Sequence, residues 1–237
     1  MKKIAAIIVA GGSGKRMGGT VKKQFIKLQG KEVLAHTIEK FNQLEEVEEI
    51  IVVVGEEDIY KVKKEIVERY EFNKVSKVVA GGQERQDSVY NGLMAMNDKI
   101  EYVMIHDGAR PFISKEILKR VIEETMEYKA TIVAVPVKDT IKVINTTTQK
   151  VEDTPKREKL WAVQTPQSFE RKLLEEAYKM AKKKELQVTD DSMIVEAYGE
   201  KVHVVLGEYT NIKITTPEDL IIGESILNKD INNKINN

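Results

Sequence analysis

The chain contains no cysteine in its 237 residues. Disulfide bonds, thiolate zinc sites and a cysteine nucleophile are therefore excluded. This absence is compatible with a reducing compartment, and we expect a cytoplasmic protein. Histidine is also scarce, with three in the chain, so side chains that titrate near neutral pH are few.

The chain also lacks an excess of either charge, because its 38 Lys and Arg residues balance its 38 Asp and Glu residues. A balanced chain lacks the broad basic surface that binds nucleic acid or anionic membranes. It can still carry a local basic pocket for a small phosphate ligand. No apolar stretch approaches the length of a membrane span. We therefore predict neither a nucleic-acid nor a membrane partner.

The amino terminus resembles the start of a signal peptide, because Met1, Lys2 and Lys3 precede the apolar residues 4–10. That apolar run is short and stops at Gly11 and Gly12. Its isoleucines and valine favour a β-strand. We therefore predict a buried first strand.

Short apolar runs alternate along the chain with segments of helical periodicity. The runs cover residues 4–10, 49–55, 75–80, 102–106, 131–137 and 202–206, and helical spacing is clearest at 59–70 and 117–126. A further helix start is predicted at Thr216, because Pro217 and two acidic residues follow it. This alternation predicts an α/β fold with an open, mostly parallel sheet. Ligands of such sheets bind beyond the carboxyl ends of the strands.

Residues 139–159 interrupt this alternation. Two short alternating runs flank the polar residues 145–149, which is typical of a β-hairpin. The hairpin either packs on its own domain or reaches a partner as an arm. The Asn-rich residues 228–237 resemble a frayed tail. We predict one domain over residues 1–227, with 139–159 as a protruding arm and 228–237 as a disordered tail.

The segment after the first strand combines small residues with cations. It contains Ala10, Gly11, Gly12, Gly14, Arg16 and, further on, Lys23. Glycines let backbone amides approach phosphates, which nearby cations neutralise. A P-loop is excluded because Val9 and Arg16 replace its required glycine and hydroxyl residue, and a dinucleotide fingerprint is excluded by Met17. The alternative is a tight turn whose charges face water.

Further motifs follow later strands. They are Gly-Gly-Gln-Glu-Arg-Gln-Asp-Ser-Val at 81–89, His-Asp-Gly-Ala-Arg-Pro-Phe at 106–112, Pro-Val-Lys-Asp-Thr at 136–140, Gln-Thr-Pro-Gln at 164–167 and Asn-Ile-Lys at 211–213. With the glycine loop, these motifs resemble the 2-C-methyl-D-erythritol 4-phosphate cytidylyltransferases over nearly the whole chain. The related ribitol-5-phosphate cytidylyltransferases are the alternative, although residues 85–89 and 189–192 favour the erythritol family.

The resemblance implies a Rossmann-like nucleotidyltransferase domain of the GT-A type. It also implies transfer of a cytidylyl group from CTP to 2-C-methyl-D-erythritol 4-phosphate, giving 4-diphosphocytidyl-2-C-methyl-D-erythritol and pyrophosphate. This is a step of isoprenoid precursor synthesis by the non-mevalonate pathway. The expected cofactor is Mg²⁺ or another divalent cation. The expected assembly is a homodimer in which the arm at 139–159 embraces the second subunit and completes its active site.

The resemblance also assigns roles to residues. The implied catalytic residues are Arg16, Lys23, Arg157 and Lys213. Those implied for nucleotide binding are Ala10, Gly11, Gly12, Gly14, Gly81, Gly82, Ser88 and Arg110. Those implied for the acceptor are Thr140, Arg157, Thr165 and Lys213, and Asp107 is the implied metal ligand. Some of these residues also have a structural reading: solvated cations for Arg16 and Lys23, plain turns for the glycines, and an Asx turn at Asp107.

Some positions near these motifs are less informative. His106 is expected to be a packed strand-end residue, and Asp190 and Asp191 suit either the cleft or a helix start. Thr210 stands where many relatives carry an acid. Two other classes remain open. A glycosyltransferase would favour an Asp-x-Asp metal motif, which residues 107–109 do not form, and a non-catalytic nucleotide-binding module would not need Arg16, Lys23 and Asp107 together.

Overall fold

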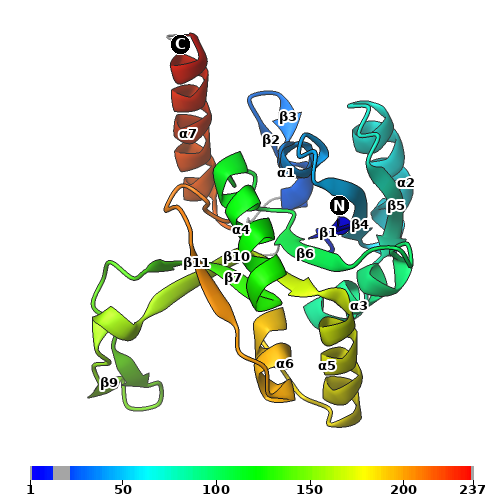
Figure 1. The fold of residues 1–237 in the computed structure, drawn as a ribbon. Coiled ribbons are helices and arrows are strands. Elements are labelled where there is room, and N and C mark those ends of the chain that lie inside the picture. The colour runs from blue at the N-terminus through cyan, green and yellow to red at the C-terminus, as the bar shows by residue number, and fades with distance from the viewer. Residues whose placement is uncertain (1, 13–21, 236–237) are drawn as a thin grey trace.

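The computed structural model describes residues 2–12 and 22–235 (Figure 1). Its main sheet has seven strands in the order β11-β7-β10-β6-β1-β4-β5. These are β1 (Ile4–Val9), β4 (Val47–Val54), β5 (Val75–Ala80), β6 (Tyr102–Asp107), β7 (Ala130–Pro136), β10 (Trp161–Glu170) and β11 (His203–Leu206). Every apolar run predicted as a strand lies in this sheet, so the α/β prediction is confirmed.

The sheet is mostly parallel, as predicted, with one exception. β1 pairs in parallel with β4 and β6, β4 with β5, and β7 with β11. β10 is antiparallel to both of its neighbours, β6 and β7. The sequence did not predict β10, because proline argues against a central strand. A register shift between Val163 and Gln167 accommodates Pro166.

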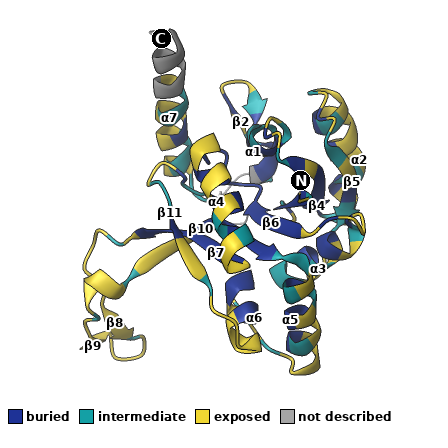
Figure 2. Ribbon diagram, viewed as in Figure 1, coloured by how far each residue is buried: buried dark blue, intermediate teal, exposed yellow. Residues whose placement is uncertain are grey.

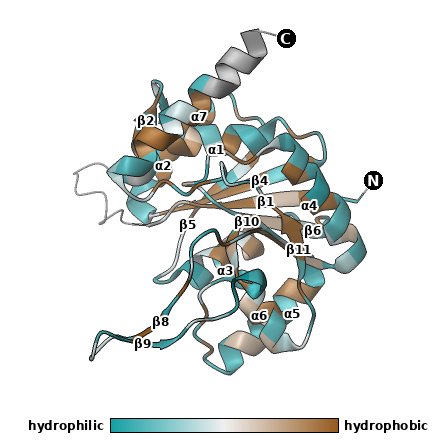
Figure 3. Ribbon diagram, turned by 90° about the vertical axis from the view of Figure 1, so that its left-hand side faces the viewer, coloured by the Kyte–Doolittle hydropathy of each residue, from teal (hydrophilic) through white to brown (hydrophobic). Residues whose placement is uncertain are grey.

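Both faces of the sheet are covered by helices, as Figure 3 shows edge-on. On β1, Ile4, Ala6 and Ile8 enter one hydrophobic cluster while Ala5 and Ile7 enter the other. The first cluster includes α1 (Val33–Asn42), α2 (Ile59–Val62) with its π-helical continuation Lys63–Glu68, and α4 (Lys115–Tyr128); the second includes α3 (Arg85–Ala95), α5 (Arg171–Lys183) and α6 (Asp191–Tyr198). Burial on both faces explains why the strands are continuously apolar.

A third, smaller cluster holds α7 (Pro217–Ile235) against β2 (Lys27–Leu28), which pairs antiparallel with β3 (Lys31–Glu32). The predicted start of α7 is confirmed, because the Asp219 carboxylate accepts the amides of Thr215 and Thr216, each at 2.8 Å. Residues 228–235 are helical, which differs from the predicted disordered tail. No glycine or proline follows Gly223, so no strong breaker ends the helix earlier.

The predicted hairpin is confirmed. β8 (Val143–Asn145) and β9 (Lys150–Asp153) pair antiparallel in a sheet of their own, and a 3₁₀-helix (Arg157–Lys159) follows. Figure 2 shows that the hairpin is exposed and extends from the body of the molecule. Its apolar side chains include Ile144 and Val151, which are 40% and 57% exposed.

No described helix is both long enough and apolar enough to cross a membrane.

The packing of α3 on the sheet gives a first prediction. A Cβ at Gly92 would lie 2.7 Å from Ile7 Cγ2 and 3.0 Å from Val53 Cγ2. Gly92→Val should therefore destabilise the protein by about 1–3 kcal/mol through overpacking, measured as a lower urea midpoint by circular dichroism. Met94→Val on the exposed side of α3 is the matched control and should change stability by less than about 0.5 kcal/mol. Equal effects of the two substitutions would contradict this packing.

Candidate active site

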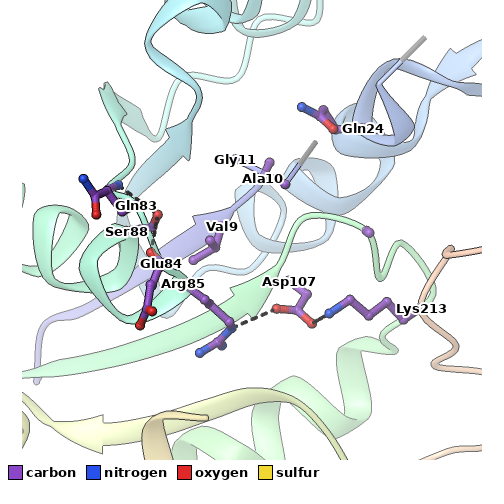
Figure 4. A pocket seen from close by; sticks show the side chains of 13 residues that line it. Val9, Ala10, Gly11, Gln24, Gln83, Glu84, Arg85, Ser88, Asp107 and Lys213 are labelled. Atoms are coloured by element: carbon purple, nitrogen blue, oxygen red, sulfur yellow. Dashed lines mark hydrogen bonds and ion pairs between the residues drawn. The ribbon is translucent and has the colours of Figure 1, made fainter. Parts of the chain in front are cut away.

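The carboxyl ends of β1 and β6 and the loop after β5 meet at a pocket of about 210 Å³ (Figure 4). Its lining residues are Val9, Ala10, Gly11, Gly12, Gln24, Gly82, Gln83, Glu84, Arg85, Ser88, Asp107, Ala109 and Lys213. The pocket therefore lies where a parallel sheet is expected to bind its ligand. It unites seven of the residues predicted from sequence: Ala10, Gly11, Gly12, Gly82, Ser88, Asp107 and Lys213.

Asp107, the last residue of β6, carries the negative charge at the centre of the site. Lys213 Nζ lies 2.7 Å from its Oδ2, Arg85 Nε lies 3.5 Å from its Oδ1, and Arg110 Nε lies 3.7 Å from its Oδ2. Burial alone would raise the pKa of the Asp107 carboxyl, but these three cations hold that pKa well below its usual range. Asp107 is therefore ionised at neutral pH.

The backbone of Asp107 is held from behind. Its amide donates to Thr165 Oγ1 at 3.1 Å, Thr165 Oγ1 lies 3.0 Å from His106 Nδ1, and His106 Nε2 lies 2.9 Å from the Arg110 carbonyl. A carbonyl only accepts, so His106 carries its proton on Nε2 and accepts from Thr165 on Nδ1. Burial lowers the pKa of His106 to about 4, and the ring is neutral. The packed role predicted for His106 is confirmed.

The loop after β5 is shaped by its contact with α3. A Cβ at Gly81 would lie 2.6 Å from Ser88 Oγ, and a Cβ at Gly82 would lie 2.2 Å from Asp87 Cβ. These glycines therefore let the first turn of α3 approach the loop. The Gly82 amide donates to Ser88 Oγ at 3.1 Å, which fixes this hydroxyl at the wall of the pocket. Gly81 precedes that wall without lining it.

Six of the lining residues were not assigned a role from sequence: Val9, Gln24, Gln83, Glu84, Arg85 and Ala109. Two of these, Gln24 and Arg85, have side chains in a distinctive environment. Gln24 is 1% exposed, and neither polar atom of its amide has a hydrogen-bond partner in the described part of the chain. Arg85, the first residue of α3, reaches towards Asp107 (Figure 4). Arg85 lies within the motif at 81–89, and Gln24 directly follows Lys23. Motif position was the only signal, because neither residue type is unusual on a protein surface.

Other predicted residues lie outside this pocket. Arg110 donates from Nη1 to the Asn211 carbonyl at 2.9 Å, so it supports Asp107 from beside the pocket rather than lining it. The Thr165 hydroxyl is buried against Asp107 and His106. Their contacts with nucleotide and acceptor stay predictions. Asp190 and Asp191 begin α6 rather than line the pocket.

Thr140 and Arg157 lie at the base of the hairpin. Thr140 is exposed, and Arg157 donates from Nη1 to the Lys138 carbonyl at 3.0 Å. Arg157 lines a shallow hollow with Pro136, Val137 and its chain neighbours, separate from the pocket at Asp107. Within one chain, the residues predicted for the acceptor therefore occupy two places.

Three predicted positions cannot be placed in the pocket. Gly14 and Arg16 lie outside the described residues, and so does the side chain of Lys23. The backbone of Lys23 begins a 3₁₀-helix (Lys23–Phe25), which also carries Gln24 to the pocket.

Comparison with known proteins decides the family. Residues 4–229 match the sequence profile of the 2-C-methyl-D-erythritol 4-phosphate cytidylyltransferases. The chain belongs to this family. The enzyme of that name from Alkaliphilus oremlandii is 51% identical over 96% of both chains, and that of Clostridioides difficile is 47% identical over 98% of this chain and 97% of its own.

Solved structures agree with this cytidylyltransferase assignment. The 4-diphosphocytidyl-2C-methyl-D-erythritol synthase of Anaerococcus prevotii is 39% identical, covers 96% of both chains and has a TM-score of 0.83. The cytidylyltransferase of Thermus thermophilus has a TM-score of 0.78 at 31% identity, over 95% of this chain and 98% of its own. The protein is therefore a nucleotidyltransferase enzyme, and the family predicted from the sequence motifs is confirmed.

The ion pairs of Asp107 give a prediction for stability. Asp107→Asn leaves the guanidinium of Arg110 without its counter-charge and should destabilise the protein by about 3 kcal/mol. This loss of stability is at the low end of the range for breaking a buried ion pair, because the Lys213 side chain is partly exposed to water. Urea unfolding at pH 7 is the measurement. The control is Asp98→Asn, a fully exposed carboxylate 3.8 Å from Arg171, where the expected change is below about 0.5 kcal/mol. Similar losses in both variants would contradict this electrostatic arrangement.

Proposed function

We propose that this cytidylyltransferase transfers the cytidylyl group of CTP to 2-C-methyl-D-erythritol 4-phosphate, releasing pyrophosphate, as a step of the non-mevalonate route to isoprenoid precursors. The observation that carries this proposal is the pocket itself. There the glycine segment after β1 faces the ionised Asp107 and the cation Lys213. Backbone amides, a carboxylate and a cation together suit a nucleoside triphosphate with a divalent metal.

Two segments that line the pocket suit the two parts of the nucleotide. Ala10, Gly11 and Gly12 present backbone where the triphosphate would lie, continuing towards Gly14, Arg16 and Lys23. Gly82 and Ser88 form the wall for cytosine and its ribose, with Gly81 behind them. Arg110 acts on the nucleotide indirectly in this proposal, by holding Asp107 and the carbonyl of Asn211.

Asp107 fits the role of the metal ligand. The described residues contain no cluster of three or more metal-ligating side chains. Mg²⁺ typically takes one or two carboxylates and completes its octahedral shell with phosphates and water. The ionised Asp107 could supply one oxygen, while Lys213, about one-third exposed, is free to exchange its contact with Asp107 for a phosphate oxygen. The metal would neutralise charge on the phosphates.

The chemical step requires little from the protein beyond positioning. A phosphate monoester has a second pKa near 6, so the acceptor phosphate is mostly dianionic at pH 7 and needs no general base. One of its oxygens attacks the α-phosphorus of CTP, and the bond to pyrophosphate breaks. Arg16 and Lys23 would stabilise the charge that develops, and Lys213 would hold the attacking phosphate. The buried, neutral His106 takes no part in proton transfer.

The separation of Arg157 from Asp107 supports a shared active site in a homodimer. An isolated hairpin is marginal in water, and this one exposes Ile141, Val143, Ile144 and Val151. We propose that a second copy of the chain covers these side chains. In that arrangement, Thr140 and Arg157 at the base of the arm meet the acceptor in the partner's pocket. The cytoplasmic location stays a prediction.

Substrate choice is the most direct test of this function. CTP with 2-C-methyl-D-erythritol 4-phosphate should support pyrophosphate release at least about 100-fold faster, as kcat/KM, than the same acceptor with ATP or GTP. Ribitol 5-phosphate should be the poorer acceptor with CTP. Faster turnover of ribitol 5-phosphate would instead make the protein a ribitol-5-phosphate cytidylyltransferase. Equal use of purine triphosphates would contradict the assignment of the nucleotide pocket.

The pH dependence should follow the acceptor rather than the protein. The value of kcat/KM should fall below about pH 6 with unit slope, because the acceptor phosphate gains a proton there. His106, with a pKa of about 4, stays neutral over this range. With a phosphorothioate acceptor, whose second pKa is lower, the pH at which kcat/KM falls should be lower by the difference between the two acceptors' pKa values. If kcat/KM falls at the same pH with both acceptors, the titrating group belongs to the enzyme.

Subunit mixing tests the shared site. Arg157→Ala and Lys213→Ala should each be nearly inactive as homodimers. After subunit exchange, one of the two sites in a mixed dimer contains both residues intact, so activity should rise towards one quarter of the wild-type value in an equal mixture. The control is two separate preparations of one variant, mixed and treated in the same way. Proven exchange without recovery, or a monomer at assay concentration, would contradict the shared arrangement.

A further inference from the structure

Asp191 is a buried carboxylate that the reaction does not use directly. It begins α6 and has no exposed surface. Its Oδ1 accepts from the Tyr178 hydroxyl at 2.7 Å, and its Oδ2 accepts from Arg85 Nη1 at 2.7 Å. Its own amide donates to Gln167 at 3.0 Å. The amide and both carboxylate oxygens of Asp191 are thus held in place, and its charge faces Arg85.

Arg85 shares its guanidinium between two carboxylates. Nη1 donates to Asp191, whereas Nε lies 3.5 Å from Asp107 Oδ1, beyond the usual length of a hydrogen bond. Burial would lower the pKa of Arg85, but Asp191 and then Asp107 raise it. The stronger of the two contacts is therefore with Asp191, outside the pocket, and the weaker one is with Asp107, inside it.

We propose that Asp191 is a positioning residue that holds Arg85 away from Asp107, so that the Asp107 carboxylate can bind a divalent cation. The inference rests on the proposed metal role of Asp107. Without the charge of Asp191, the buried guanidinium of Arg85 has Asp107 as its nearest counter-charge among the described residues. A close ion pair between Arg85 and Asp107 would then compete with the metal for the same oxygens.

The arrangement of α6 supports this role. Asp190, beside Asp191 in sequence, caps the helix by accepting the Met193 amide at 3.0 Å and also accepts from Gln167. The capping function is thus already filled by Asp190. Asp191 is the carboxylate that reaches Arg85, and the contact with Tyr178 keeps it buried rather than turned into the pocket.

The test measures metal binding directly. Mn²⁺ is titrated by electron paramagnetic resonance into each protein saturated with α,β-methylene CTP, which cannot transfer its cytidylyl group. Asp191→Asn should raise the Mn²⁺ Kd about 10-fold or more, as is typical when a residue that orients a metal ligand is lost. Asp190→Asn removes a carboxylate one residue away without touching Arg85, and its Kd should stay within about twofold of wild type.

A double variant separates positioning from general damage to the fold. Asp191→Asn combined with Arg85→Gln removes both charges, so no guanidinium remains to move onto Asp107. Its Mn²⁺ Kd should return to within about threefold of wild type, a non-additive result that a purely structural role for Asp191 would not produce. Thermal unfolding of each variant confirms that the compared proteins are folded.

The possible outcomes separate this inference from the metal site on which it rests. If Asp107→Asn lowers Mn²⁺ affinity while Asp191→Asn leaves it unchanged, Asp191 does not position Arg85 for the metal. Failure of the double variant to recover would likewise overturn the inference. If Asp107→Asn keeps wild-type Mn²⁺ affinity, then Asp107 is not the metal ligand and both proposals fall.

Discussion

The site depends on one buried carboxylate and the cations around it. Asp107 ends the central strand β6. Arg85 approaches it from the start of α3, Arg110 from the turn after β6, and Lys213 from the segment before α7. A lone carboxylate at this depth would take up a proton, and three cations this close together would repel one another. Each charge therefore requires the others. Because three cations surround one carboxylate, the cluster keeps positive charge that can attract phosphates.

The scaffold explains how these charges come together. Parallel strands direct their carboxyl ends to one edge of the sheet, so Ala10 after β1 and Asp107 at the end of β6 become neighbours although they lie far apart in sequence. β10 contributes from the opposite direction. Its Thr165 hydroxyl accepts the amide of Asp107 and connects it to His106. The antiparallel strand thus fixes the residue on which the chemistry is proposed to depend.

Much of the sheet and of the pocket could be predicted from sequence. Continuous apolar runs indicate buried strands, and the glycines that follow them indicate turns. The pocket residues at 10–12, together with Gly82, Ser88 and Asp107, followed from motifs placed after predicted strands. β10 did not, since the central Pro166 contradicts the usual rule for strands, and only the bulge in its pairing resolves the conflict. The contact between Arg85 and Asp191 also escaped prediction. Their partnership joins α3 to α6, and no local pattern reports a contact across 106 residues.

The most direct measurement follows the fate of the phosphorus atoms of CTP. With 2-C-methyl-D-erythritol 4-phosphate and Mg²⁺, label at the α-phosphorus of CTP should appear quantitatively in the diphosphate product. Label at the γ-phosphorus should appear in pyrophosphate, and neither transfer should occur without the acceptor. Transfer of γ-label to the acceptor, or release of pyrophosphate with no acceptor present, would contradict cytidylyl transfer at the pocket of Asp107 and Lys213.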